Sequence, residues 1–243
     1  MRYIISGLDG NVGKLIKKMA IEYINYSNDI DVKGNEVFLH LASRSYGSYQ
    51  DIINANIDYL CEVIEFCKSN NISKFVFFSA CSIYNKDDIY SVSKLLGEKI
   101  LKESKMKILI LRLPMILTSD KKYGILNRII HKLEKDDDVE LYNAHRVFNN
   151  FISVDEIYNF IELYPFLNDC ETIDLVSNDQ NSLLDITEML KEIMGSKSNI
   201  VELKKLESDI NLSINNIIDK YGYLPLKNSD KLKRWINLRN KNE

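Results

Sequence analysis

Clusters of metal-ligating residues are what this 243-residue sequence most clearly lacks. Its four cysteines form no C-x-x-C pair, and its three histidines do not have the spacing of metal ligands. We therefore expect buried thiols, no metal site and no redox role for cysteine. Cys61 and Cys67 in particular are expected to pack within a long helix.

Long apolar runs and a concentrated basic face are also missing. No apolar stretch approaches the roughly 18 to 20 residues of a membrane span, and the chain begins with a β-prone segment where a signal sequence would be apolar and longer. The net charge is −3 and the isoelectric point is near 5.8, which argues against a nucleic acid or a membrane surface as partner. We expect a cytoplasmic metabolic protein.

Glycine is scarce, yet three of the nine glycines lie close together as Gly7, Gly10 and Gly13. A β-prone run, residues 2–6, precedes them, and residues 14–19 continue as a helix. Glycine suits a turn in which the backbone must bend sharply, approach a pyrophosphate and pack a helix against a strand. The N–H groups at the start of the helix then face the phosphates. The spacing predicts a dinucleotide-binding turn.

Tyr90 and Lys94 are the residues that suggest chemistry. Four residues apart on a helix, a phenol and an ammonium lie on one face. A free tyrosine has a pKa of about 10, and a neighbouring positive charge lowers it toward the range that an acid–base catalyst needs. The pair therefore predicts proton transfer coupled to hydride chemistry on a nicotinamide cofactor.

Further segments follow the glycine turn in a recognisable order. They are residues 36–43 (EVFLHLAS), 54–58 (NANID) at the start of a long helix, 74–84 (KFVFFSACSIY), 108–114 (ILILRLP), 150–157 (NFISVDEI), and 173–177 with 182–184.

Together with the glycine turn and the Tyr-Lys pair, these segments resemble the extended short-chain dehydrogenases/reductases, and in particular the NAD-dependent epimerase/dehydratase group, which acts on nucleotide sugars. The resemblance covers nearly the whole chain. The corresponding family patterns are, in order, V-x-H-L-A-A, an Asn-containing helix, F-V-x-x-S-S-x-x-V-Y, a strand ending in Arg-x-Pro, D-F-I-x-V-D-D-x, and a closing strand and helix.

The resemblance implies an α/β fold, with a Rossmann-type doubly wound parallel sheet and a small C-terminal substrate lobe. The alternation of strand and helix signals independently favours α/β. We expect one unit over residues 1–243, whose dinucleotide-binding part covers about 1–117 and 147–178. The substrate lobe would then cover about 118–146 and 179–243.

The family pattern also implies a role for individual residues. Tyr90 would exchange the proton, Lys94 would hold the nicotinamide ribose and lower the Tyr90 pKa, and Ser79 or Ser82 would orient the substrate oxygen. Substrate contacts would come from Ser79, Ser82, Tyr90 and Arg146. Cofactor contacts would come from Gly7, Gly10, Asn11, Val12, Gly13, Leu41, Ala42, Ser43, Arg44, Asn56, Tyr90, Lys94, Leu113 and Pro114.

The region between the first helix and the second motif departs from the family, because residues 20–35 replace two strands and a helix. Residues 21–26 alternate enough to be a strand or the last turns of the helix, and residues 29–31 could stand for the acidic loop at the adenosine ribose. No acidic residue that would select NAD is identifiable. A 2′-phosphate could be met by cations, which slightly favours NADP(H) over NAD(H); the candidates are Lys14, Lys17, Lys18 and Arg44.

The substrate side departs as well. Ala80 stands where the family usually carries its catalytic Ser or Thr. Ser79 and Ser82 flank it, and both are equally good candidates for the hydroxyl that bonds the substrate oxygen. Met115 and Asn149 replace an Asn and an Arg that help to hold the sugar nucleotide, and Arg146 is the nearby candidate for the diphosphate. The segment between residues 84 and 89 is short, as in the capsule-sugar reductases of polysaccharide biosynthesis.

These features predict an oxidoreductase that acts on a nucleotide-linked sugar, most simply a reductase of a keto-sugar intermediate. The alternatives are an epimerase on the same scaffold and a non-catalytic dinucleotide-binding or scaffold protein. A dehydratase ranks last, because residues 80–82 supply no carboxylate. Helices at residues 52–69 and 91–105 correspond to those that form a four-helix dimer interface in relatives, so we expect a homodimer.

Two expectations concern the C-terminal part. Trp235, Tyr221 and Tyr223 should close a small core, although aromatic rings could also stack on a base. Residues 239–243 are polar and should fray.

Overall fold

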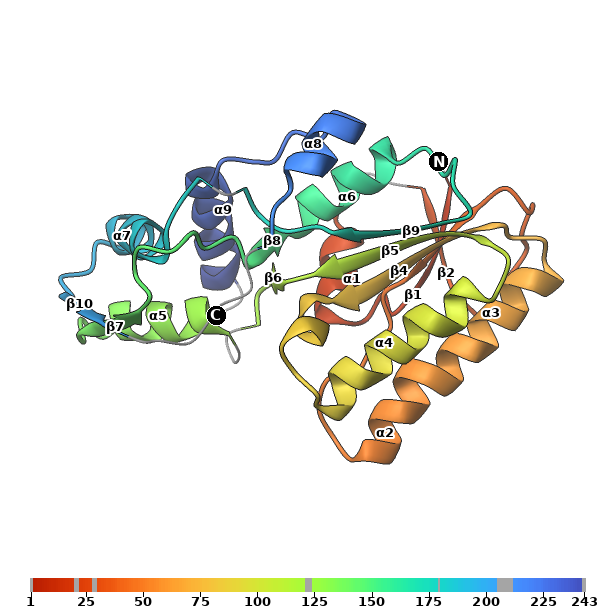
Figure 1. Ribbon diagram of the computed structural model, residues 1–243, viewed down its shortest axis with the longest axis horizontal. Coiled ribbons are helices and arrows are strands. Elements are labelled where there is room, and N and C mark those ends of the chain that lie inside the picture. The colour runs from red at the N-terminus through yellow and green to blue at the C-terminus, as the bar shows by residue number, and fades with distance from the viewer. Residues whose placement is uncertain are drawn as a thin grey trace. The chain divides into compact units, whose positions relative to one another are not determined.

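A computed structural model describes residues 2–19, 22–27, 30–120, 124–178, 180–204 and 212–241. The chain divides into two compact units (Figure 1). The first unit consists of Met1–Pro114 and Asn159–Leu175, and the second of Met115–Tyr158 and Val176–Glu243.

The first unit is built on a parallel sheet of six strands in the order β2-β1-β3-β4-β5-β9. Its central strands are apolar and buried, because helices cover both faces of a parallel sheet. The predicted α/β fold with a parallel sheet is confirmed. The strands are β1 Tyr3–Ser6, β2 Tyr23–Asn25, β3 Val37–His40, β4 Lys74–Ala80, β5 Lys107–Leu113 and β9 Cys170–Asp174.

The order of the strands decides where the helices lie. The connection from β1 to β2 runs in one direction across the sheet and those from β3 to β5 run in the other, so right-handed crossovers place α1 on one face and α3 and α4 on the opposite face. Figure 1 shows α3 and α4 side by side. The helical elements of this part are α1 Asn11–Ile16, α2 Tyr49–Ile53, a π-helix η1 Asn54–Asp58, α3 Tyr59–Ser69, a 3-10 turn η2 Cys81–Tyr84 and α4 Ile89–Lys102.

The shortened region forms a strand and not the end of the first helix. β2 pairs with β1, and it is the only strand among residues 22–27 and 30–36 as the structure describes them. The Tyr26 ring that follows β2 packs edge-on against Phe38 and Phe66, at centroid distances of 5.3 and 5.0 Å. The segment thus fills the hydrophobic core beside α3. Asp29, from the predicted acidic loop, lies outside the described residues.

The second unit combines two small parallel pairs of strands with helices around one core. Trp235 lies in that core, and its indole N–H donates to the Thr118 carbonyl at 2.7 Å. The prediction of core positions is confirmed for Trp235 and Tyr223, whereas Tyr221 is only half-buried. The elements are β6 Met115–Leu117 paired with β8 Phe151–Ser153, β7 Val139–Tyr142 paired with β10 Ile200–Leu203, α5 Ile125–Leu133, α7 Leu183–Met194, α8 Asn215–Tyr221 and α9 Asn228–Asn240. The helix α6 Val154–Leu163 begins in this unit, and its residues from Asn159 on belong to the first unit.

Two smaller expectations were wrong. Arg239 does not fray: it is the last buried residue of α9, with its guanidinium 5.2 Å from the Trp235 ring centroid, because a planar cation can stack on an aromatic face. Residues 242–243 lie outside the described part of the chain. Cys61 and Cys170 are exposed, while Cys67 and Cys81 are buried as expected.

An ion pair between Glu156 and Lys231 is buried in the second unit, each residue being only 1% exposed. Lys231 Nζ lies 2.6 Å from Glu156 Oε1 and also donates to Ser177 Oγ at 2.6 Å. The carboxylate accepts two further bonds from the backbone N–H groups of Ser153 and Leu226. Burial lowers the pKa of Lys231, and the Glu156 charge opposes that effect. Lys231 therefore depends on Glu156 for its charge.

We predict that Lys231→Ala lowers the free energy of unfolding by about 3–5 kcal/mol, because it leaves the Glu156 carboxylate buried without a counterion. Urea unfolding followed by circular dichroism measures the loss. Arg234→Ala is the matched control: Arg234 pairs with Asp155 at 3.5 Å between the same two helices but at the surface, so it should cost no more than about 1 kcal/mol. Equal losses in the two variants would contradict the prediction.

Candidate active site

The glycine turn packs directly on the loop that follows β3. Gly7 has φ +82°, and a Cβ on it would lie 2.6 Å from the Ala42 backbone nitrogen. A Cβ on Gly13 would lie 2.6 Å from the Leu8 carbonyl carbon, so α1 also touches the turn without any intervening side chain. Gly10 is less restricted, since its nearest contact would be the Gly7 carbonyl oxygen at 3.3 Å. The turn has the bare backbone that a pyrophosphate needs to approach closely.

The Asn56 side chain holds the loop after β3 through hydrogen bonds to the Arg44 backbone. It lies in the π-helix η1 and is 3% exposed. Its Oδ1 accepts from the Arg44 backbone N–H at 2.8 Å, and its Nδ2 donates to the Arg44 carbonyl at 3.0 Å and to Ser93 Oγ at 2.9 Å. Ser93 Oγ in turn donates to the Tyr90 carbonyl at 2.7 Å. One amide therefore joins the loop to the first turns of α4, and a π-turn at such a place is typical of functional sites.

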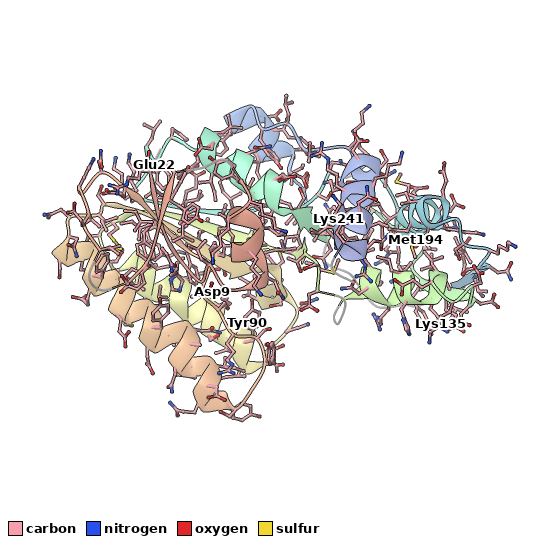
Figure 2. All side chains as sticks on the ribbon, turned by 180° about the vertical axis from the view of Figure 1, so that it is seen from behind. Asp9, Glu22, Tyr90, Lys135, Met194 and Lys241 are labelled. Carbon is pink, nitrogen blue, oxygen red and sulfur yellow. The ribbon has the colours of Figure 1, made fainter. Side chains whose placement is uncertain are left out.

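Tyr90 and Lys94 lie on one face of α4, as predicted, with Lys94 Nζ 5.8 Å from the Tyr90 ring centroid. Asp88 caps the helix by accepting from the Ser91 N–H at 2.8 Å. Lys94 is 3% exposed, and its ammonium donates to the Phe78 carbonyl at 2.8 Å over the Phe77 ring. In Figure 2, which labels Tyr90, this residue lies on the α4 ribbon. The sequence spacing thus brings phenol and ammonium together at the end of β4.

Burial dominates the electrostatics of the pair. It lowers the pKa of Lys94 to about 7, against the opposing effect of the Glu98 charge. It also raises the pKa of Tyr90; a hydrogen bond with Ser43 opposes that rise, and the Asp88 charge adds to it. The expected lowering of the Tyr90 pKa by Lys94 is therefore wrong for this structure, because the phenol loses more from burial than it gains from its neighbours.

The two candidate serines are both bonded within the protein. Ser79 Oγ donates to Glu98 Oε1 at 2.6 Å, and Ser82 Oγ lies 2.8 Å from Ser91 Oγ. Ala80, at the usual hydroxyl position, ends β4. Ser79 has its hydrogen on a carboxylate, whereas Ser82 shares its bond with another hydroxyl that can act as donor or acceptor. The choice between the two serines remains a prediction.

A charged network at the ends of β4, β5 and β9 was missed by sequence reasoning. Glu98 holds Arg112 through two bonds, at 3.0 and 2.7 Å, and Arg112 donates to the Tyr84 hydroxyl at 2.6 Å. Tyr84 donates to Asp174 at 2.8 Å. The spacing of Tyr90, Lys94 and Glu98, each four residues after the last, was a signal that could have placed Glu98 on the same helix face. The other partners are distant in sequence.

The remaining predicted residues lie at the carboxyl ends of strands or in the second unit. Leu41 and Ala42 follow β3, Leu113 ends β5 and is followed by Pro114, and Asn11 and Val12 begin α1. Arg146 belongs to the second unit, where it is exposed in the turn after β7 and its N–H donates to the Asn143 carbonyl at 3.0 Å. Their roles remain predictions.

Comparison with known proteins gives a family and a fold. The model of the NAD dependent epimerase/dehydratase family matches residues 31–164, more than half of the chain. No curated protein sequence matches significantly. Among solved structures, UDP-glucuronic acid 4-epimerase from Bacillus cereus in complex with NAD is similar with a TM-score of 0.73 and 19% identity, and the match covers 99% of each chain.

Two further structures extend the likeness. RMD from Pseudomonas aeruginosa, complexed with NADPH, has a TM-score of 0.77 and 15% identity, with 100% of this chain and 99% of that chain covered. UDP-N-acetylglucosamine 4-epimerase from Methanobrevibacter ruminantium M1, in complex with UDP-N-acetylmuramic acid, has a TM-score of 0.76 and 17% identity, with the same coverage. At these identities the likeness establishes the fold.

We predict that Gly13→Ala lowers the free energy of unfolding by about 1–3 kcal/mol, because the new methyl group overlaps the backbone of Leu8. The midpoint of thermal unfolding reports the effect. Gly10→Ala is the control in the same turn: its φ of −72° suits any residue and its closest contact is 3.3 Å, so its cost should stay under about 1 kcal/mol. A Gly13 variant as stable as the Gly10 variant would refute the close packing.

Proposed function

The chain belongs to the NAD dependent epimerase/dehydratase family, and from this we propose that it transfers hydride between a nicotinamide cofactor and a nucleotide-linked sugar, as an epimerase. The sequence ranked a reductase first and an epimerase second. The epimerase now comes first, because two of the three similar structures described above are nucleotide-sugar 4-epimerases. The proposal assigns cofactor binding to the first unit and sugar binding largely to the second.

The observation that carries the proposal is the pairing of Tyr90 and Lys94 on α4, in the same unit as the glycine turn. The Lys94 ammonium lies over the Phe77 ring, but that packing does not account for the phenol of Tyr90 on the same helix face. Most buried lysines bind a carboxylate, whereas Lys94 donates to a carbonyl and has donors to spare for a ligand hydroxyl.

The residues of the first unit fit a nicotinamide dinucleotide. Gly7 and Gly13 leave the backbone bare for a pyrophosphate, and the Lys94 ammonium is the donor for the hydroxyls of the nicotinamide ribose. When bound, the cofactor supplies and accepts the hydride. Tyr90 would act at the sugar oxygen: its phenolate would take the hydroxyl proton as the sugar carbon is oxidised, and the resulting phenol would return the proton as the carbon is reduced.

A reductase is the second candidate, and the short segment at residues 85–88 favours it. The similar structure of RMD is complexed with NADPH, a reduced cofactor of the kind that a reductase consumes. Deuterium distinguishes the two. A reductase consumes deuterated NAD(P)H in proportion to product and leaves the label in the sugar. An epimerase inverts the sugar without net consumption of cofactor, so its product has the mass of its substrate. Mass spectrometry of the nucleotide sugar, with cofactor absorbance recorded in parallel, reports both quantities.

We predict that Tyr90→Phe reduces turnover at least about 100-fold and leaves cofactor affinity nearly unchanged, because it removes only the transferable proton. Lys94→Ala should impair both, because Lys94 would hold the cofactor as well. Stopped assays with nucleotide sugars and fluorescence titrations with the cofactor measure the two effects. Unchanged turnover in Tyr90→Phe would refute the assignment, and binding of cofactor without turnover of any sugar in the wild type would favour the non-catalytic alternative.

The cofactor preference depends on which cations remain available for a 2′-phosphate. Two of the four candidates are held by carboxylates: Lys17 lies 2.8 Å from Asp9, and Arg44 lies 3.8 Å from Asp51. These pairs weaken the case for NADP(H). Parallel titrations with NADH and NADPH decide between the cofactors, and Lys14 and Lys18, both exposed on the first helix and the turn after it, are the residues to change if NADPH binds more tightly.

We also propose that the protein is a cytoplasmic homodimer that serves polysaccharide biosynthesis. No described helix is long and apolar enough to cross a membrane. On α4, Val92, Leu95 and Leu96 are exposed and share one face, which is an apolar surface that a second copy could cover.

Leu96→Asp is therefore predicted to convert a dimer to a monomer, because it places a charge in the centre of that surface. Solution scattering gives the mass of the particle. Leu167→Asp is the control, since Leu167 is exposed in the loop before β9 and away from α4. A wild-type protein that is already monomeric would contradict the dimer.

A further inference from the structure

A pair of hydroxyls, those of Ser82 and Ser91, joins the turn after β4 to the helix that carries Tyr90. Ser82 lies in η2 and is half-buried, whereas Ser91 lies on α4 and is 1% exposed. The two Oγ atoms are 2.8 Å apart. The Ser91 backbone N–H donates to the Asp88 carboxylate at 2.8 Å. The Ser82 carbonyl accepts from the Lys86 N–H at 3.0 Å. Both hydroxyls are therefore carried by anchored backbone.

The burial of Ser91 decides which hydroxyl donates. Two hydroxyls contribute two hydrogens, and only one hydrogen can lie in the bond between them. Within the described part of the chain, Ser82 Oγ is the only hydrogen-bond partner of Ser91 Oγ. If Ser82 donated, the Ser91 hydrogen would be buried without an acceptor, which is costly. If Ser91 donates, its hydrogen is satisfied, and the hydrogen of the half-buried Ser82 stays available to a ligand.

Ser79, the other candidate for the substrate oxygen, is already occupied. It is 4% exposed, and its hydroxyl donates to the Glu98 carboxylate at 2.6 Å. In the register of the sheet it lies beside Arg112, whose guanidinium binds the same carboxylate. A hydrogen bond to a charged acceptor is roughly twice as strong as one between neutral groups, so Ser79 does not readily release its hydrogen. Ala80 has no hydroxyl, and Ser82 is therefore the donor that this segment can offer.

We propose that Ser82 donates the hydrogen bond to the substrate oxygen, and that Ser91 is the positioning residue that directs the Ser82 O–H away from the interior. The inference rests on the proposed function; it assigns the role left open between Ser79 and Ser82, and it adds Ser91. By donating to Ser82, the Ser91 hydroxyl also polarises it and makes it a stronger donor. No covalent bond forms or breaks at either serine, because the transferred proton passes between the sugar oxygen and Tyr90.

The test is a double-mutant cycle on Ser82 and Ser91, with UDP-glucose, UDP-glucuronic acid and UDP-N-acetylglucosamine as the probes. Ser82→Ala should lower kcat about 10- to 100-fold, because it removes a donor to the oxygen on which charge develops. Ser91→Ala should lower kcat about 3- to 10-fold, because the Ser82 hydroxyl then loses its fixed direction. The double variant should match Ser82→Ala within about twofold, because Ser91 acts through Ser82. The dissociation constant of the cofactor should not change in any of the three variants.

Ser104→Ala is the matched control, because it makes the same chemical change at a buried serine beyond the end of α4. It should leave kcat unchanged. Ser91→Ala keeps the backbone N–H that Asp88 caps, so the start of the helix is retained. Urea unfolding followed by circular dichroism verifies that each variant is folded under the conditions of the assay.

The results that overturn the inference differ from those that overturn the proposed function. Turnover in Ser82→Ala equal to that of the wild type removes the role of Ser82 and leaves that of Tyr90 intact. A larger loss in Ser79→Ala than in Ser82→Ala would assign the role to Ser79. Losses that multiply in the double variant would show that Ser91 does not act through Ser82. Turnover that survives Tyr90→Phe removes the proposed function, and a wild type that turns over none of the probes removes it together with the inference.

Discussion

The polar stripe that α4 turns toward the sheet is the constraint on which the rest of the first unit depends. Tyr90, Lys94 and Glu98 follow one another at intervals of four residues, and Lys94 and Glu98 are almost wholly buried. A buried charge is stable only with partners. The Lys94 ammonium donates to the Phe78 carbonyl, and the Glu98 carboxylate accepts from Ser79 and pairs with Arg112. The helix can therefore dock in one register, and that register carries Tyr90 to the end of β4.

The loop after β3 is held by contacts with two elements, the glycine turn and the π-helix η1. The Gly7 turn presses on the Ala42 backbone, where no side chain could fit, and the Asn56 amide clamps the backbone of Arg44. Asn56 reaches that position from a π-helix, and it also binds Ser93 on α4. Direct contacts thus join the glycine turn, the loop after β3 and α4.

Local spacing explains how much of this could be predicted. The glycine turn and the shared face of Tyr90 and Lys94 follow from intervals of three and four residues, which fix neighbours on a turn or a helix whatever the rest of the chain does. The bonds of Asn56 to the Arg44 backbone and the Glu98–Arg112–Tyr84 network join residues from different elements. Their pairing depends on strand order and helix register. The direction of the Tyr90 pKa shift also could not be predicted without the fold, because burial raises that pKa more than the neighbouring groups lower it.

Apart from Ala80, which stands at the position of the usual catalytic Ser or Thr, the departures from the family pattern lie where binding is expected. Loss of Arg112 alone would leave the Glu98 carboxylate buried without its counterion, at a cost on the order of 3–5 kcal/mol. The short segment at residues 85–88 and the exposed turn that contains Arg146 face no such penalty. We therefore expect changes in ligand preference to arise in these exposed segments, while the buried pair of Glu98 and Arg112 keeps α4 in its place on the sheet.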